Sequence, residues 1–245
     1  MIFDIIKEIS SVAGYLWEKG WAERNAGNLS VNVTEFVHIP EVKLYSFKLG
    51  MKIPSLANCV LLVSSSGSRM RDMKRSPLNH LIFLVFDKEG GSFSKYKLNS
   101  RRHYFITEDI PSSELPVHLF IHGFIKKKNP GLKSVLHTHP TELISLSHRK
   151  ECSNEKRMNR MLASAHAEFK LFFPRGLGLI KEQESGNTRI AAETIKSLEA
   201  HNPVLWKKHG VISVSDKIEN AFDLIDIANK AAKIFLLAGQ NSFSR

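Results

Sequence analysis

The stretch Val135–Pro140, which reads Val-Leu-His-Thr-His-Pro, places the strongest constraint on the fold. Its apolar start favours a strand, and Pro140 ends that strand because proline has no amide hydrogen for a ladder. Side chains alternate between the two faces of a strand, so His137 and His139 project to the same side and can share one metal ion. Two histidines at a strand end can also act only as hydrogen-bonding groups, and the motif alone leaves both interpretations open.

A zinc site with catalytic activity needs three protein ligands and one open position, so a third histidine is required. His209 is the best candidate, because it lies between the apolar segment Pro203–Trp206 and the strand-like segment Gly210–Val214, which can run beside the first strand. His118 and His122 form the second candidate pair, four residues apart on a predicted helix. Their position beside apolar residues is more typical of core or interface histidines.

The length of 245 residues predicts one large domain covering residues 1–245. Cys59 and Cys152 are the only cysteines, so neither a disulfide scaffold nor a cysteine zinc site is indicated. No apolar run approaches the ~18 residues that cross a bilayer, and the segment Met1–Asp4 lacks the pattern of a signal peptide. We therefore expect a cytoplasmic protein that does not bind a membrane.

The net charge of +11 arises from 35 Lys and Arg against 24 Asp and Glu, and it favours an anionic partner such as a phosphate. Nucleic-acid binding would require the basic residues on one face with aromatic residues between them. Here they are scattered along the chain in short groups, as at Arg101-Arg102 and Lys207-Lys208. The charge pattern therefore predicts no nucleic-acid partner.

Hydrophobic periodicity predicts a mixture of helices and strands. Helices are predicted over residues 2–20, 111–128, 141–149, 154–166, 187–200 and 215–232. Strands are predicted over residues 29–33, 60–63, 81–87, 92–98, 135–139, 169–173, 203–206 and 210–214. For residues 34–58, the sequence predicts a loop with at most a short strand.

Two polar loops follow or precede predicted strands and can hold an anion. In the loop 25–28, Gly27 has no Cβ to obstruct the approach of backbone amides to a ligand. In the loop 64–68, hydroxyls and a glycine come directly after a buried strand. Both compositions also describe ordinary turns, so the residues alone do not decide between the two interpretations.

Glu114 stands where the predicted helix 111–128 begins, after Ser112 and Ser113. Serines followed by a proline in the first turn are typical of a helix start. The carboxylate can cap this helix, or it can act as a general base near a metal with the serines on a phosphate. Spacing does not distinguish the two roles.

Four segments in this order resemble the class II aldolase/adducin family: residues 20–29 (Gly-Trp-Ala-Glu-Arg-Asn-Ala-Gly-Asn-Leu), 112–118 (Ser-Ser-Glu-Leu-Pro-Val-His), 137–140 and 209–211. The first segment and residues 173–178 are more similar to an aldolase of this family than to its epimerases. Ala26 stands where the family usually has glycine. The likeness covers about residues 10–240 and implies a three-layer α/β/α fold with a central, mainly antiparallel sheet, and a homotetramer with active sites at subunit borders.

The matching motifs also imply roles for individual residues. Glu114 takes the position of the catalytic base, and Glu168 that of a carboxylate that reaches the neighbouring subunit's site and handles the aldehyde oxygen's proton. The resemblance implies that His137, His139 and His209 bind one zinc per subunit. It also implies that the substrate and its phosphate are bound by Asn25, Gly27, Asn28, Ser66, Gly67, Ser112 and Ser113.

The activity implied by the resemblance is a zinc-dependent, reversible cleavage of L-rhamnulose 1-phosphate to dihydroxyacetone phosphate and L-lactaldehyde. Such a cleavage leaves an enediolate, which a zinc held by three neutral imidazoles can stabilise with its full double charge. One alternative is another sugar-phosphate aldolase or 4-epimerase of the family, acting on fuculose 1-phosphate or ribulose 5-phosphate. A second is a non-catalytic, adducin-like interaction module, which has no reason to keep all three histidines and Glu114.

Overall fold

The computed structural model of the protein describes residues 1–39, 46–181 and 188–239. The helices in these residues are α1 (Ile2–Glu18), α2 (Met70–Arg75), α3 (Pro77–His80), α4 (Leu115–Lys128), α5 (Thr141–Ser147), α6 (Glu155–Ala165), α7 (Ala167–Phe172), α8 (Thr188–Leu198) and α9 (Ile218–Ala238). The strands are β1 (Asn28–Asn32), β2 (Phe47–Lys48), β3 (Val60–Ser64), β4 (Leu81–Phe86), β5 (Ser92–Leu98), β6 (Tyr104–Ile106), β7 (Ser134–Thr138), β8 (Gly178–Ile180), β9 (Val204–Trp206) and β10 (Gly210–Ser215).

The strands form one sheet in the order β2-β5-β4-β3-β1-β7-β10-β9-β8, with β6 paired to β5. All neighbouring pairs are antiparallel except β8 and β9. The mainly antiparallel sheet agrees with the prediction. At its centre, β7 lies between β1 and β10, with His137 opposite Asn28 on one side and Ile212 on the other.

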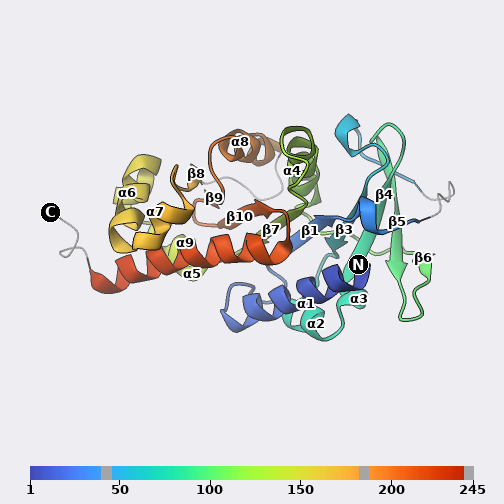
Figure 1. The fold of residues 1–245 in the computed structure, drawn as a ribbon, viewed down its shortest axis with the longest axis horizontal. Helices are drawn as coiled ribbons and strands as arrows, with labels where there is room; N and C mark the ends of the chain where they lie inside the picture. The colour runs from blue at the N-terminus through green and yellow to red at the C-terminus, as the bar shows by residue number, and fades with distance from the viewer. Residues whose placement is uncertain (40–45, 182–187, 240–245) are drawn as a thin grey trace.

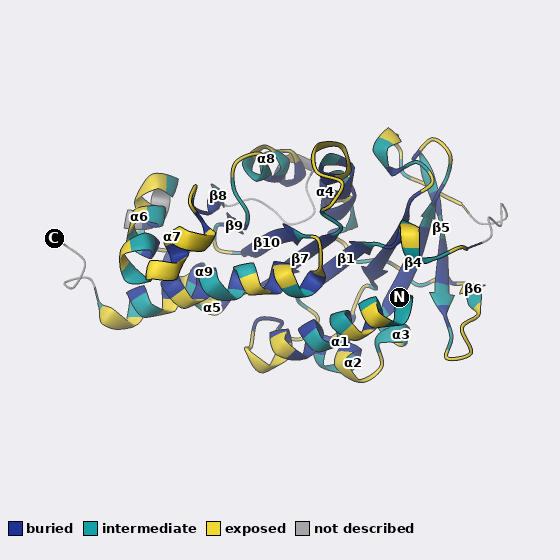
Figure 2. Cartoon of the chain, viewed as in Figure 1, coloured by how far each residue is buried: buried dark blue, intermediate teal, exposed yellow. Residues whose placement is uncertain are grey.

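Helices cover both faces of the sheet (Figure 1). On one face, α9 packs on β7 and β10 and against α1, α5 and α6. On the other face, α4 packs against α8 and β7. Alternation along β7 explains the two cores: Leu136 faces the core beneath α1 and α9, whereas Val135 faces the core with α4 and α8. Figure 2 shows the central strands as buried.

The predicted strand 169–173 is wrong, because these residues belong to helix α7 and its C-terminal end. A short apolar run fits a strand or a buried helical turn equally well. The rings of Phe169 and Phe173 lie 5.0 Å apart, one helical turn along the chain, while Leu171 faces solvent. In the helix, Phe169 and Phe173 both pack into the core, and this packing favours the helix over a strand.

The other predicted helices and strands are present, with shifts of a few residues at their ends, whereas α2, α3, β6 and β8 were not predicted. The helix predicted from residue 111 begins at Leu115, and the one predicted from residue 215 begins at Ile218. The predicted cap Asn187 lies outside the described residues. In the described ranges, the helices are too short or too polar to cross a membrane.

Candidate active site

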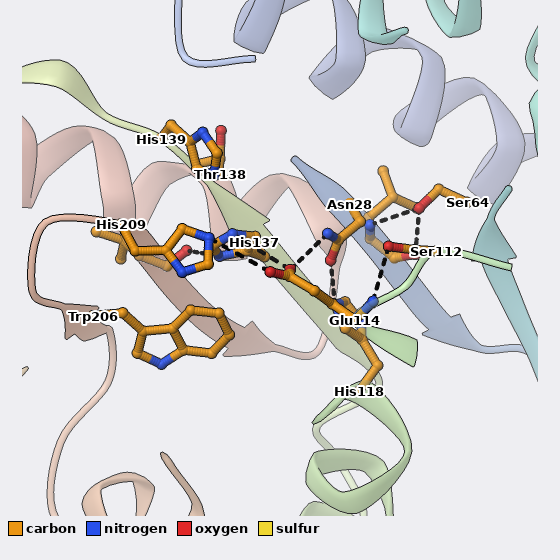
Figure 3. A network of polar contacts seen from close by, with 12 residues as sticks. Asn28, Ser64, Ser112, Glu114, His118, His137, Thr138, His139, Trp206 and His209 are labelled. Carbon is orange, nitrogen blue, oxygen red and sulfur yellow. Dashed lines mark hydrogen bonds and ion pairs between the residues drawn. The ribbon is translucent and has the colours of Figure 1, made fainter. Parts of the chain in front are cut away.

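Three histidine rings meet at the end of β7. The ring centroids of His137 and His139 lie 5.1 Å apart, and His209 lies 5.0 Å from the first and 5.3 Å from the second. One ring nitrogen from each residue lies within 4.8 Å of the other two, so the three nitrogens can hold one metal ion. Figure 3 shows the three rings with the Glu114 carboxylate beside them.

The turn between β9 and β10 brings His209 to this position. The His209 amide donates to the Trp206 carbonyl at 3.0 Å, and Lys208 adopts a positive φ of 61°. The next residue, Gly210, leaves room for the rings, because a Cβ there would lie 2.8 Å from His137 Cε1 and 2.8 Å from His139 Cδ2. The absence of a side chain at Gly210 is therefore part of the site's geometry.

Hydrogen bonds on the far side of two rings fix which nitrogen faces the site. His137 Nδ1 lies 3.1 Å from the Val211 carbonyl, an acceptor only, so it carries the hydrogen. This leaves His137 Nε2 as a buried atom without a hydrogen-bond partner in the described chain. His139 Nδ1 lies 2.8 Å from the Glu23 carboxylate. A histidine that ligates a metal through one nitrogen usually donates the other nitrogen's hydrogen to such a group, so the residues fit a metal ion.

Burial lowers the pKa of His137 and of His209 below the ordinary value of histidine. Both rings are therefore neutral near pH 7. A neutral imidazole offers a nitrogen lone pair and brings no positive charge that would repel a cation.

Glu114 is almost fully buried, with 5% of its surface exposed, and its carboxylate points toward the histidines. Oε2 lies 3.4 Å from His137 Nε2, and Oε1 lies 3.5 Å from His209 Nε2. Burial alone would raise the pKa of Glu114, but the His137 ring and the hydrogen bond from Asn28 lower it below its usual range. The side chain makes no capping hydrogen bond to α4, although the residue occupies the N-cap position. The carboxylate of Glu114 therefore does not cap helix α4.

A cavity of about 210 Å³ joins these residues to the two polar loops. We name it the histidine cavity. It is lined by every residue that the motifs assign to the site except Glu168: Asn25, Gly27, Asn28, Ser66, Gly67, Ser112, Ser113, Glu114, His137, His139 and His209. Ala26, Ser64 and Ser65 complete its lining.

Backbone hydrogen bonds hold the serine loops side by side. The Ser112 amide donates to the Ser64 carbonyl at 3.2 Å, and the Ser66 amide donates to the Ile110 carbonyl at 2.6 Å. In the loop 25–28, Gly27 has a positive φ of 76°, whereas Ala26 is not among the described residues with positive φ. The alanine therefore costs this loop no left-handed strain.

Glu168 lies elsewhere, exposed in the first turn of α7. It lines a separate groove of about 640 Å³ with Glu142, His166, Asp226 and Lys233, among others. We name it the Glu168 groove. No residue lines both this groove and the histidine cavity.

Sequence reasoning missed two residues that shape the site, Glu23 and Gly210. Both stand inside the motifs at residues 20–29 and 209–211: Glu23 lies two positions before Asn25, and Gly210 directly follows His209. The spacing did not show that Glu23 would reach His139, because that contact joins residues 116 positions apart.

Comparisons with known proteins agree with this architecture. The profile described as "Class II Aldolase and Adducin N-terminal domain" matches residues 7–236. A rhamnulose-1-phosphate aldolase of Bacteroides thetaiotaomicron is 37% identical over 97% of this chain and 87% of its own length. One from Yersinia pestis is 31% identical over 90% of this chain and 80% of its own.

Solved structures show the same fold. A sugar-phosphate aldolase from Thermotoga maritima superposes with a TM-score of 0.80 at 30% identity, covering 100% of this chain and 97% of the other. An L-fuculose 1-phosphate aldolase gives a TM-score of 0.57 at 19% identity, over 99% and 88% of the two chains. The second likeness concerns the fold alone.

Proposed function

The chain belongs to the class II aldolase and adducin family, and we propose that it is a zinc-dependent aldolase that reversibly cleaves L-rhamnulose 1-phosphate to dihydroxyacetone phosphate and L-lactaldehyde. One observation carries the proposal: a single cavity combines three convergent histidines, a buried carboxylate and two loops rich in hydroxyls and glycine. The similarity to rhamnulose-1-phosphate aldolases over nearly the whole chain supports the choice of substrate.

In this proposal, His137, His139 and His209 hold the zinc. His137 Nε2 is buried and makes no hydrogen bond within the described chain, which supports this assignment. When bound, the zinc supplies positive charge that stabilises the enediolate left by cleavage of the carbon–carbon bond. The Val211 carbonyl and the Glu23 carboxylate keep two of the rings turned toward the ion.

Glu114 is the base that exchanges the proton on carbon. In the direction of synthesis, its ionised carboxylate takes a proton from the carbon next to the carbonyl of dihydroxyacetone phosphate. The electron pair that remains forms the new bond to the aldehyde carbon, and the aldehyde oxygen takes up a proton from Glu168 of a neighbouring subunit. General acid–base help of this kind contributes ~10²–10⁴-fold.

The two polar loops bind the phosphate. Hydroxyls of Ser66, Ser112 and Ser113, together with backbone amides at Gly27 and Gly67, offer donors to phosphate oxygens. Among the described residues, no Lys or Arg lines the histidine cavity. Binding energy from the phosphate, remote from the reacting carbon, positions the substrate for reaction.

The proposed assembly is a homotetramer with active sites at subunit borders, as in the family. The location of Glu168 supports this part, because its carboxylate is exposed and lies outside the histidine cavity of its own chain. A second copy of the chain would supply the missing carboxylate to each site.

The decisive experiment offers L-rhamnulose 1-phosphate, L-fuculose 1-phosphate and L-ribulose 5-phosphate separately and measures release of dihydroxyacetone phosphate, with and without a chelator. We expect release from L-rhamnulose 1-phosphate that the chelator abolishes and added zinc restores. Glu114→Gln should bind zinc and lose ~10²–10⁴-fold in rate. Release from the fuculose ester alone would overturn the assignment, and it would favour the alternative aldolase.

A non-catalytic interaction module is the competing class of function. Metal analysis distinguishes the two, since the proposed enzyme holds close to one zinc per chain. A folded, metal-free wild type that gains no activity with added zinc would favour the module.

A further inference from the structure

The carboxylate of Glu114 is the end of a chain of buried hydrogen bonds. Asn28 Nδ2 donates to Glu114 Oε2 at 2.8 Å, a contact drawn in Figure 3. The other atom of the same amide, Asn28 Oδ1, lies 2.5 Å from His118 Nε2. The Asn28 side chain therefore bridges the carboxylate and a histidine of α4.

The chain continues away from the histidine cavity. Ser30 Oγ lies 2.6 Å from His118 Nδ1 and 2.8 Å from His122 Nε2. His118 and His122 stand one turn apart on α4, and Ser30 lies two residues after Asn28 on β1. None of these four side chains is more than 7% exposed, so water does not compete for their hydrogen bonds.

Both histidines in this series of hydrogen bonds, His118 and His122, are neutral at ordinary pH. Burial lowers the pKa of His118 to about 4 and that of His122 to about 3. A neutral imidazole has one donor nitrogen and one acceptor nitrogen, whereas an ionised carboxylate only accepts. These limits restrict the directions that the hydrogen bonds can take.

The directions follow one after another from Glu114. The carboxylate accepts from the Asn28 amide group, so Asn28 Oδ1 must accept from His118 Nε2–H. His118 Nδ1 then has no hydrogen and accepts from the Ser30 hydroxyl. The Ser30 oxygen in turn accepts from His122 Nε2–H. Every donor therefore points toward Glu114.

The reverse direction is incompatible with an ionised Glu114. It would turn the Asn28 carbonyl toward the carboxylate and place two acceptor oxygens at 2.8 Å with no hydrogen between them. An unpaired buried polar group of this kind is costly. The four hydrogen bonds from His122 to Glu114 thus have one arrangement in which each joins a donor to an acceptor while the base is ionised.

We propose that His118, Ser30 and His122 are positioning residues for the reaction: through Asn28 they hold the Glu114 carboxylate in the orientation in which it accepts the proton from carbon. This inference rests on the proposed function, in which Glu114 is the base. The competing interpretation is that the two histidines only fill and satisfy the core beneath α4, so that their loss would affect stability and not the proton step.

The test compares two substitutions at one position. His118→Gln keeps an N–H group at a similar reach, whereas His118→Leu fills the space without a donor. The measured step is deuterium exchange from D₂O into dihydroxyacetone phosphate without aldehyde, which isolates the Glu114 proton transfer from formation of the carbon–carbon bond. Zinc content and the affinity for dihydroxyacetone phosphate are measured on the same samples.

We expect His118→Leu to slow the exchange by about 10²-fold, as for a misplaced reacting group, while zinc content and affinity change little. His118→Gln should restore most of the rate. Ser30→Ala, a smaller change that is compatible with the fold, should slow exchange by about tenfold, the effect of one lost hydrogen bond. Equal rates for the wild type and the leucine and alanine variants, or losses matched by falling zinc content, would overturn the proposal.

A spectroscopic readout tests the hydrogen-bond directions without relying on activity. Side-chain ¹⁵N shifts in the zinc-loaded wild type should identify His118 as the neutral Nε2–H tautomer. An Nδ1–H tautomer would overturn the inferred direction. If the expected tautomer is found but the wild type exchanges no deuterium, the proposed function fails and the positioning role fails with it. An active wild type whose His118→Leu variant is equally fast would reject the positioning role alone.

Discussion

The histidine cavity and the Glu168 groove hold their polar groups in different ways. In the cavity, hydrogen bonds on the far side of the His137 and His139 rings orient them, and His137 Nε2 makes no hydrogen bond within the described chain. In the groove, charges pair with each other, as in Lys19 with Asp226 at 3.0 Å and Lys233 with Glu142 at 3.5 Å. These exposed pairs contribute little to stability.

Glu168 differs from these paired groups. Within the described ranges, its side chain makes no hydrogen bond or ion pair, and it is exposed. The cavity thus brings together three histidine nitrogens of one chain that could hold a metal ion, whereas in the proposed function Glu168 acts only in the site of a neighbouring subunit. Five measurements can break or sharpen this contrast.

The largest effect is expected for His139→Ala. Removing one of three ligands leaves two, so zinc content should fall to near zero and cleavage of L-rhamnulose 1-phosphate should fall to the detection limit. His148→Ala, which removes an exposed histidine outside the cavity, is the matched control. Full zinc occupancy in the His139→Ala protein would show that the cavity does not hold the metal through this ring.

The next effect concerns the groove. Glu168→Gln should lower the cleavage rate by ~10²–10⁴-fold, because it removes a proton donor and acceptor, and it should leave zinc content unchanged. Glu199→Gln, at an exposed position outside both sites, is the control.

Mixing the inactive Glu168→Gln and His139→Ala proteins tests whether Glu168 acts across a subunit border. After subunit exchange, some sites combine an intact zinc site with an intact Glu168 from the neighbour, and about a quarter of wild-type activity should return if mixing is random. If the mixed proteins exchange subunits without recovering activity, Glu168 does not act in a neighbour's site.

A smaller effect is expected for Glu23→Ala. The loss of the carboxylate that binds His139 Nδ1 should weaken zinc binding by about 10–100-fold, as is typical when a group behind a metal ligand is removed. Glu35→Ala, which breaks an exposed ion pair with Lys133, is the control and should leave zinc affinity unchanged. Competition with a chelator of known affinity measures both. Equal affinities would mean that the ring needs no carboxylate to hold its orientation.

The smallest effect concerns stability against pH. The folded-state pKa of His118 is about 4, against 6.5 for the unfolded chain, because the ring is buried. Below pH 6.5 the unfolded chain takes up a proton that the folded protein does not, so the free energy of unfolding should fall as the pH drops from 6.5 toward 4. Urea unfolding of metal-free protein should show a shallower fall for His118→Gln. His166→Gln, at the Glu168 groove, provides the comparison, and identical pH slopes for His118→Gln and wild type would contradict the prediction.

The sequence predicted the parts of this site that depend on local geometry. The two-residue period of a strand places His137 and His139 on one side, and turn-forming residues mark the loops at 25–28 and 64–68. The convergence of His209 with them depends on the register of β7 and β10, which local patterns do not encode. The flanking apolar segments made His209 the best candidate for the third ligand, and the motif resemblance then implied the same role.

Two other features depend on tertiary contacts that local sequence patterns do not reveal. The apolar run 169–173 fits two periods, and only packing against the core selected the helix. His118 and His122 were expected to be core or interface residues, and both are buried. Their link to Glu114 runs through Asn28 on β1, 90 positions away from His118, which helix spacing alone does not reveal.

The pairing of β7 with β10 also bears on the order in which the nascent polypeptide folds and can bind a metal ion. His137 is fixed by a carbonyl group that lies 74 residues later in the chain. During synthesis, the first two imidazoles leave the ribosome well before the third exists, so an ion captured at that stage would have an incomplete set of ligands. In the proposed zinc enzyme, tight binding of the metal would therefore follow the pairing of β7 with β10, so that metal uptake would report the completion of folding.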